Sequence, residues 1–161
     1  MLASIAGAHG APEERDQQIE RSGMYAEYPA ILHAYIELMS DEESSLEALK
    51  RAVFLIWRSA MALPAISGIA SLPDGDARRV LGELDTRVRR DAIDEELWWM
   101  LAWYHGEGPF VLELYGAVDD LRRTLERMGP EGWRSASITL AAMATRGQMG
   151  RYWSALAAGT R

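Results

Sequence analysis

The residues with the clearest capacity for metal chemistry are two histidines and one carboxylate. Glu37 follows His33 by four positions, so on a helix both side chains would lie on one face. His105 would add a third ligand from the end of another helix. Imidazole and carboxylate groups bind zinc, so these three residues form a hypothetical metal site. The alternative is a partly buried imidazole at His33 and, at His105, a protonated ring that favours the negative end of a helix dipole.

Arg51 and Arg58 form a second candidate constellation, within the most apolar stretch of the chain. A buried guanidinium needs a partner, and an anionic small molecule held against an aromatic pocket would supply one. A small-molecule or metal-binding helical bundle is therefore the alternative function, including an enzyme that uses His33, Glu37 and His105.

Familiar catalytic motifs are missing from the sequence. It contains no glycine-rich phosphate loop, no G-x-S-x-G, no H-E-x-x-H and no E-x-x-H pair of the di-iron type. The chain also has no cysteine, which excludes thiolate nucleophiles and cysteine-ligated metals. We therefore expect no catalytic residue, no metal and no cofactor, although an enzyme built from scattered residues stays an alternative.

A cluster of aromatic residues, Trp98, Trp99, Trp103 and Tyr104, is the most unusual local feature. Trp98 and Trp99 would point about 100° apart on a helix, so one of them can reach the surface. Exposed tryptophans often anchor contacts with partner proteins. We predict that Trp98 or Trp99, together with Trp103, belongs to a partner-binding face. Packing in the core and an aromatic ligand pocket are the alternatives.

The segment RGQMGRYW, residues 146–153, is the second predicted partner-binding region. No acidic residue follows Glu131, so this basic and aromatic segment carries its charge unopposed by nearby carboxylates. It would be a docking segment or an anion-binding loop. Alternatively, it forms a tight turn between the last two helices and its aromatic rings fold back onto the bundle. The residues assigned to partner binding here are Arg146, Arg151, Tyr152 and Trp153.

The charge distribution argues against nucleic acid as a partner. Arginines gather in residues 78–90 and 122–127, but acidic residues alternate with them. The chain has a net charge of −7 and a pI near 5.0, so phosphate contacts would be made against an opposing field. Residues 1–50 carry −7 and residues 101–161 carry +1, so the acidic front and the basic tail should attract each other.

Apolar residues recur three and four positions apart along most of the chain, which predicts helices throughout. The widest apolar surface belongs to residues 45–63, where Ser44 and Glu47 match a capping box and Pro64 would end or kink the helix. Asp94 should cap a later helix. The other helices are expected to start near Pro29 and after Asp76, to run from Phe110 to Met128 and from about Trp133 to Gly147, and to cover Arg151 to Ala158.

These elements predict an all-α, single-domain bundle of about six helices around the central apolar helix at about 45–63. We expect residues 1–24 to form a flexible, acidic N-terminal tail with at most one weak helical turn after Pro12, and residues 25–161 to form the helical bundle domain. No alternating, β-branched pattern with hairpin turns occurs, which excludes a sheet.

The composition of the 161 residues, 48% apolar and 25% charged, is that of an ordinary globular domain. No apolar run is long enough to span a membrane, and the first residues lack the basic and apolar regions of a signal peptide. We therefore expect a cytoplasmic protein without membrane contact. The predicted function is non-catalytic: binding a partner protein, or self-association, as an inhibitor, immunity factor or assembly factor does.

Overall fold

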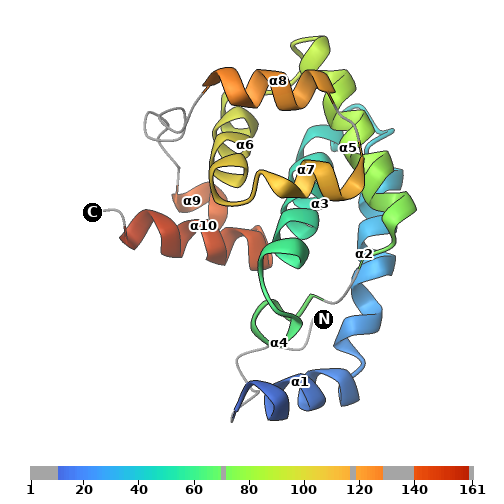
Figure 1. Ribbon diagram of the computed structural model, residues 1–161, viewed down its shortest axis with the longest axis vertical. Helices are drawn as coiled ribbons and strands as arrows, with labels where there is room; N and C mark the ends of the chain where they lie inside the picture. The colour runs from blue at the N-terminus through green and yellow to red at the C-terminus, as the bar shows by residue number, and fades with distance from the viewer. Residues whose placement is uncertain (1–10, 70–71, 117–118, 129–139, 160–161) are drawn as a thin grey trace.

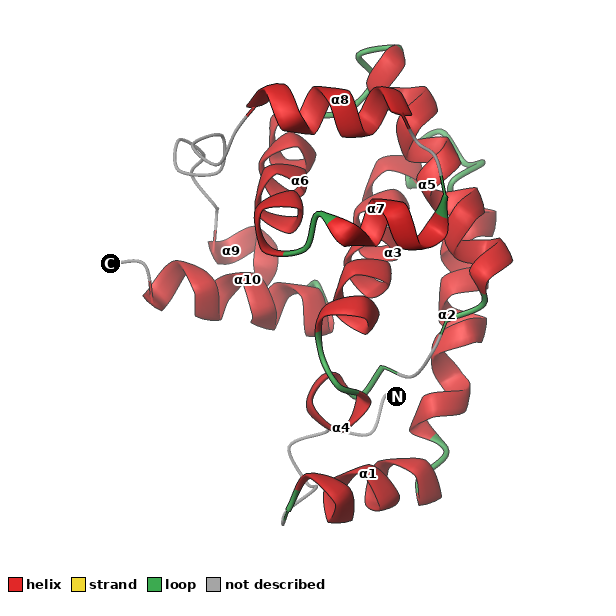
Figure 2. Cartoon of the chain, in the orientation of Figure 1, coloured by secondary structure: helices red, strands yellow, loops and turns green. Residues whose placement is uncertain are grey.

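The computed structural model describes residues 11–69, 72–116, 119–128 and 140–159, and within these ranges all regular secondary structure is α-helical (Figure 2). The helices pack into one bundle, which confirms the predicted fold class. Their bounds are α1 Pro12–Arg21, α2 Met24–Leu38, α3 Ser45–Met61, α4 Pro64–Ser67, α5 Asp74–Arg89, α6 Glu95–Glu107, α7 Phe110–Tyr115, α8 Asp119–Met128, α9 Leu140–Met143 and α10 Gly147–Gly159.

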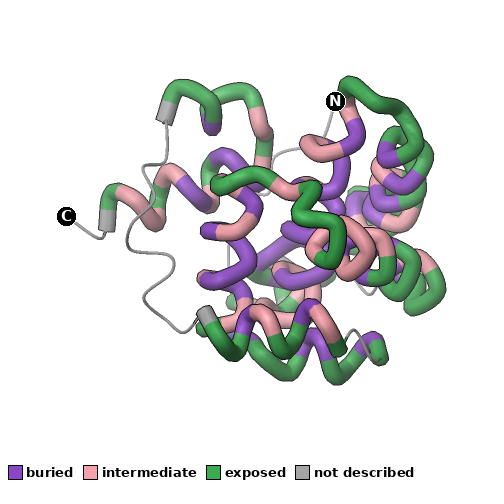
Figure 3. Tube along the Cα trace, turned by 90° about the horizontal axis from the view of Figure 1, so that it is seen from above, coloured by how far each residue is buried: buried purple, intermediate pink, exposed green. Residues whose placement is uncertain are grey.

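Helix α3 occupies the middle of the bundle, as its wide apolar surface predicts (Figure 1). Helices α2 and α5 pack against one side of it, while α6 and α10 contribute side chains to its other side. Leu49, Ile56 and Trp57 on α3 are completely or almost completely buried. In Figure 3 the buried positions follow the inward sides of the helices and the exposed positions follow the outward sides. One apolar core therefore holds the elements together.

Two of the predicted helix boundaries are confirmed. Asp94 caps α6, where its Oδ1 accepts a hydrogen bond from the Leu97 amide at 2.8 Å. Helix α3 ends at Met61, before Pro64, which then becomes the first residue of α4. A proline is tolerated at that position because the first amides of a helix have no partner inside it.

The predicted capping box at the start of α3 is wrong. Ser44 has helical backbone angles and its side chain accepts no capping hydrogen bond. Its amide and hydroxyl instead donate to Asp41 Oδ2, at 2.9 and 2.6 Å, so the preceding turn uses the serine. Glu47 is also engaged elsewhere, in the polar network described below.

The helix predicted from Phe110 to Met128 is two helices. Gly116 has φ +97° and ψ 167°, a conformation that few other residues adopt, and it ends α7 before α8 begins. Apolar periodicity continues across this break, which is why the pattern alone predicts one helix. In the separate helix α7, Val111 and Leu112 are buried, whereas Phe110 and Leu114 are exposed.

The chain termini also differ from expectation. Residues 1–24 were predicted to hold at most one weak helical turn, but α1 is a ten-residue helix that packs against α2 and α4. The flexibility of this segment stays a prediction. Helix α2 begins at Met24, before Pro29, and α10 begins at Gly147, before Arg151. The helix predicted from Trp133 falls largely outside the described residues. Among the described helices, none combines the length and apolar character that crossing a bilayer requires.

Candidate functional site

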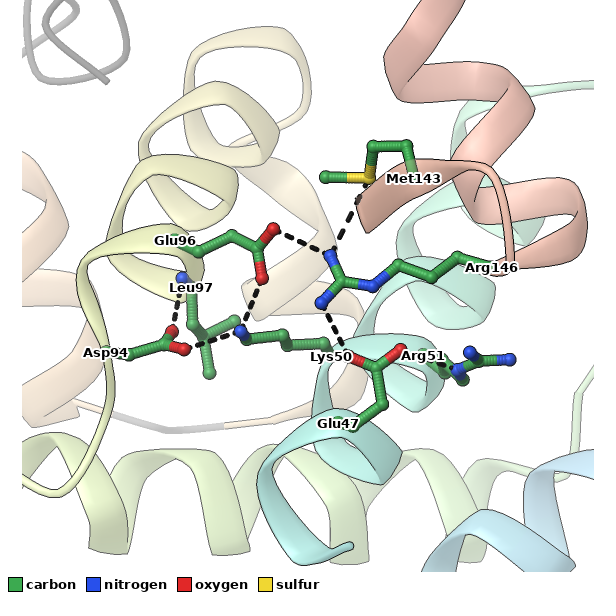
Figure 4. A network of polar contacts seen from close by, with 8 residues as sticks. All are labelled: Glu47, Lys50, Arg51, Asp94, Glu96, Leu97, Met143 and Arg146. Carbon is green, nitrogen blue, oxygen red and sulfur yellow. Dashed lines mark hydrogen bonds and ion pairs between the residues drawn. The ribbon is translucent and has the colours of Figure 1, made fainter. Parts of the chain in front are cut away.

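A polar network holds the C-terminal helix in place, and Lys50 is at its centre (Figure 4). The Lys50 side chain on α3 is only 5% exposed, and its ammonium donates hydrogen bonds to Asp94 Oδ2, at 2.6 Å, and to Glu96. Both carboxylates come from the start of α6. A buried ammonium is costly unless it is paired, so the two carboxylates compensate for its removal from water.

Arg146 extends the network to the start of α10. Its guanidinium donates to Glu96 Oε1 at 2.6 Å and forms an ion pair with Glu47 Oε2 at 2.8 Å. Glu47 Oε1 in turn accepts from Arg51 Nε at 2.8 Å. Burial would raise the pKa of Glu96, but the hydrogen bonds from Arg146 and Lys50 outweigh it and lower this pKa. The predicted attraction between the acidic front and the basic tail is thus satisfied partly inside the molecule.

The first turn of α10 has two further attachments, both through Gln148. Its side-chain amide donates to the Ser67 carbonyl at 2.6 Å, and its Oε1 accepts from the Tyr28 hydroxyl at 3.0 Å. Together with Arg146, these contacts determine where the aromatic residues of α10 lie. Arg146 itself is only 13% exposed, and its part in partner binding stays a prediction.

Trp153 on α10 is completely buried and packs against α6. Its ring centroid is 4.5 Å from that of Trp99 and 5.3 Å from that of Tyr104. Trp99 is buried as well, so neither tryptophan is available on the surface. Burial and the nearby Tyr152 raise the pKa of Tyr104 well above its ordinary value of 10.0, although the Trp153 indole acts in the opposite direction. For Trp99 and Trp153, the structure therefore corresponds to the core-packing alternative.

Trp103 and Tyr152, two further aromatic residues predicted to bind a partner, meet at the edge of a cleft. The Trp103 indole Nε1 donates to the Tyr152 hydroxyl at 2.9 Å. The cleft lies between α3, α6 and α10 and has a volume of about 150 Å³. We refer to it as the aromatic cleft. Its lining residues are Phe54, Trp57, Arg58, Met61, Trp103, Tyr104, Glu107 and Tyr152.

The charged groups of the aromatic cleft are Arg58 and Glu107. The Arg58 guanidinium carbon lies 5.3 Å from the centroid of the Tyr152 ring, within the range of a cation–π interaction. Across the described ranges, neither Arg58 nor Glu107 forms an ion pair. The Trp57 indole Nε1 donates to the Tyr104 carbonyl at 3.0 Å. The cleft therefore offers aromatic walls, one cation and one carboxylate.

Four large apolar side chains are exposed on two segments that follow the cleft residues Met61 and Glu107 in the sequence. They come from two short elements: Leu63 and Ile66 from the start of α4 and Phe110 and Leu114 from α7, with exposed fractions between 48% and 66%. Gly108 lies so close to Met61 that a β-carbon there would overlap the Met61 sulfur. Leu63 follows Met61 by two residues and Phe110 follows Gly108 by two, so the chain leaves this one contact toward α4 on one side and into α7 on the other. We call these four side chains the apolar surface.

The structure does not unite the three predicted metal ligands. The exposed His33 places its Nε2 atom 3.7 Å from Glu37 Oε1 and its Nδ1 atom 3.9 Å from Asp76 Oδ2 on α5. His105 is half-buried near Glu126, and burial lowers its pKa, so the protonated ring expected at the end of α6 is disfavoured. Where the structure describes the chain, no group of three or more histidine and carboxylate side chains is placed to hold a metal.

Two residues predicted to bind a partner, Trp98 and Arg151, lie outside both the network and the aromatic cleft. Trp98 is half-buried and Arg151 is exposed. The apolar surface was not predicted, because Phe110 and Leu114 fit the apolar stripe of one long helix; Gly116 was the signal that this helix is interrupted.

Comparison of the chain with protein-family models, curated proteins and solved structures found no match.

Proposed function

We propose that this chain binds a partner protein through the apolar surface and acts without catalysis, as inhibitors, immunity factors and assembly factors do. The observation that supports this most is the composition of α7. This short helix buries Val111 and Leu112 and also exposes Phe110 and Leu114. A helix at the surface of a bundle normally presents polar residues to water. Of the three exposed residues of α7, Phe110 and Leu114 are apolar and only Glu113 is charged.

Removing such side chains from water is energetically favourable. Burying a leucine or phenylalanine side chain contributes about 1.5–3 kcal/mol, before the costs of association are subtracted. Neighbouring exposed apolar residues on a monomer often mark a contact surface. A partner that covers Phe110, Leu114 and Leu63 would gain this free energy.

Charge indicates the chemistry of the partner. Glu107 and Glu113 flank Phe110, both are exposed, and neither has an ion-pair partner among the described residues. The chain as a whole carries −7. Like charges oppose the association of two copies, whereas a basic partner would be attracted. We therefore favour a different protein whose contact surface is apolar with basic residues around it, and self-association is the competing outcome.

Site-specific photo-crosslinking in the cells that produce the protein tests this proposal. The photoreactive residue p-benzoyl-phenylalanine replaces Phe110, and in the matched control it replaces Leu38. Leu38 is also apolar and 45% exposed. It precedes Met39, whose carbonyl accepts from Arg87, and Arg87 also contacts Ser45 at the start of α3. Leu38 therefore lies near the start of α3, whereas Gly108, two residues before Phe110, lies against Met61 at the end of α3.

We expect a discrete cross-linked product from position 110 that position 38 does not give. Mass spectrometry of that product distinguishes a different protein from a second copy of this chain. Identical products from both positions, or none from position 110, would contradict the proposal.

The cellular setting is part of the same proposal. We propose a cytoplasmic location, because a chain without cysteine needs no oxidising compartment for its stability. We also propose a protein rather than a nucleic acid as the partner, since a net charge of −7 opposes phosphate binding.

A further inference from the structure

We infer that the aromatic cleft binds a small aromatic acid, a molecule with one flat ring and one carboxylate. The first argument is size. The cleft has a volume of about 150 Å³. An apolar cavity of about 150 Å³ in another protein holds a benzene molecule. The aromatic cleft is therefore large enough for a single ring.

The walls of the cleft favour an aromatic ring. Phe54 and Trp57 come from α3, Trp103 and Tyr104 from α6, and Tyr152 from α10. The indole N–H groups of both tryptophans already donate to protein oxygens. The walls thus present mainly ring faces and edges, and aromatic rings contact one another favourably in stacked and edge-to-face arrangements.

Arg58 supplies the specificity for a carboxylate. The Tyr152 ring lies against its guanidinium, which limits the positions that this flexible side chain adopts. No carboxylate in the described part of the chain pairs with it. A guanidinium binds a carboxylate with two parallel hydrogen bonds, so an acid whose ring fills the cleft would complete the site.

Glu107 restricts the ligand further. Its carboxylate also lines the cleft and would repel a second negative charge on the ligand. It can accept a hydrogen bond from an amino or hydroxyl substituent on the ring. A monoanion is therefore preferred over a dianion. Apart from Glu107, this inference uses different residues from the proposed partner contact, and it does not depend on partner binding.

The first experiment compares three probes of similar size on the unmodified protein: benzoate, benzyl alcohol and benzylamine. Binding is followed by tryptophan fluorescence and by the NMR resonances of the indole N–H groups. We expect saturable binding of benzoate, about tenfold tighter than benzyl alcohol, with shifts at Trp57 and Trp103. Equal affinity for all three probes, or no shift at these two indoles, would overturn the inference.

Variants then test the role of each charge. Arg58→Gln should reduce benzoate affinity about tenfold and leave that of benzyl alcohol unchanged, while Arg58→Lys should give an intermediate value. Glu107→Gln should strengthen benzoate binding, because it removes a like charge. Arg78→Gln, an exposed site on α5, is the matched control and should change nothing.

Circular dichroism establishes that each variant is folded. If Arg58→Gln does not fold, the probe comparison on the unmodified protein decides the question by itself. Undiminished benzoate binding by folded Arg58→Gln would contradict the inference, as would an equal loss of benzoate and benzyl alcohol binding.

Discussion

Arg146 Nη1 lies 2.6 Å from Glu96 Oε1, and this contact joins the residue before α10 to the first turn of α6 (Figure 4). Glu96 also accepts from the buried Lys50, so one carboxylate connects three helical segments. Helix α10 carries Tyr152, which forms one wall of the aromatic cleft. The network therefore positions the cleft although it does not line it.

The first prediction concerns the stability that Arg146 provides. Arg146→Gln should lower the free energy of unfolding by about 1–3 kcal/mol, since it removes hydrogen bonds from two partly buried carboxylates. Urea denaturation followed by circular dichroism measures this change. Arg122→Gln is the control, because Arg122 is 46% exposed and lies 3.7 Å from Asp119. Equal effects of the two substitutions would show that the network contributes no particular stability.

The second prediction concerns pH and Glu96. The pKa of this carboxyl is lower in the folded protein than its ordinary value of 4.5. The stability that ionised Glu96 adds to the fold is therefore fully present above pH 4.5, and it is lost as the pH falls through the lower pKa of the folded protein. Unfolding free energies of the wild type and Glu96→Gln should differ most near neutral pH and converge at low pH. A difference that stays constant down to pH 3 would count against this account.

Local signals in the sequence predict the fold well. The dense run of apolar residues at 45–63 indicates a central helix, and Asp94 indicates a helix start. Both signals can be read from the sequence because they depend only on residues that are close together in the chain. Periodicity does not reveal the end of α7, since one glycine with a positive φ interrupts an apolar pattern that continues beyond it.

The site is less predictable because it forms between distant segments. Trp103 and Tyr152 were predicted separately, but their hydrogen bond joins residues 49 positions apart and depends on how α10 docks. Lys50 was the overlooked signal. It is the chain's one lysine, and its position in the apolar central helix implies acidic partners. Periodicity could not identify those partners as Asp94 and Glu96.

The third prediction concerns Gly116. Gly116→Ala should destabilise the fold by about 1–2 kcal/mol, because its φ of +97° strains any residue with a β-carbon. Steric overlap is not the cause, since no described residue beyond its chain neighbours comes within 4 Å of that carbon. Gly82→Ala is the matched comparison, in α5, with equally free space. It should stabilise the protein by about 0.5–1 kcal/mol. Thermal or urea unfolding gives both values, and a neutral Gly116→Ala would refute the strain argument.

The fourth prediction separates two adjacent tryptophans. Trp99→Ala should reduce the unfolding free energy by about 3–5 kcal/mol, because Trp99 is buried against Trp153. Trp98→Ala should cost clearly less, since Trp98 is half-buried. Chemical denaturation of both variants measures the difference. A larger loss for Trp98→Ala than for Trp99→Ala would mean that α6 turns Trp98, and not Trp99, toward the core.

The central claim is that the apolar surface binds a partner, and native mass spectrometry tests it most directly. The protein is isolated from its own cells as the wild type, as the double variant Phe110→Ser with Leu114→Ser, and as the control Leu38→Ser. We predict a companion chain with the wild type and with Leu38→Ser, and the free protein alone with the double variant. The same companion bound to all three, or to none, would contradict the claim.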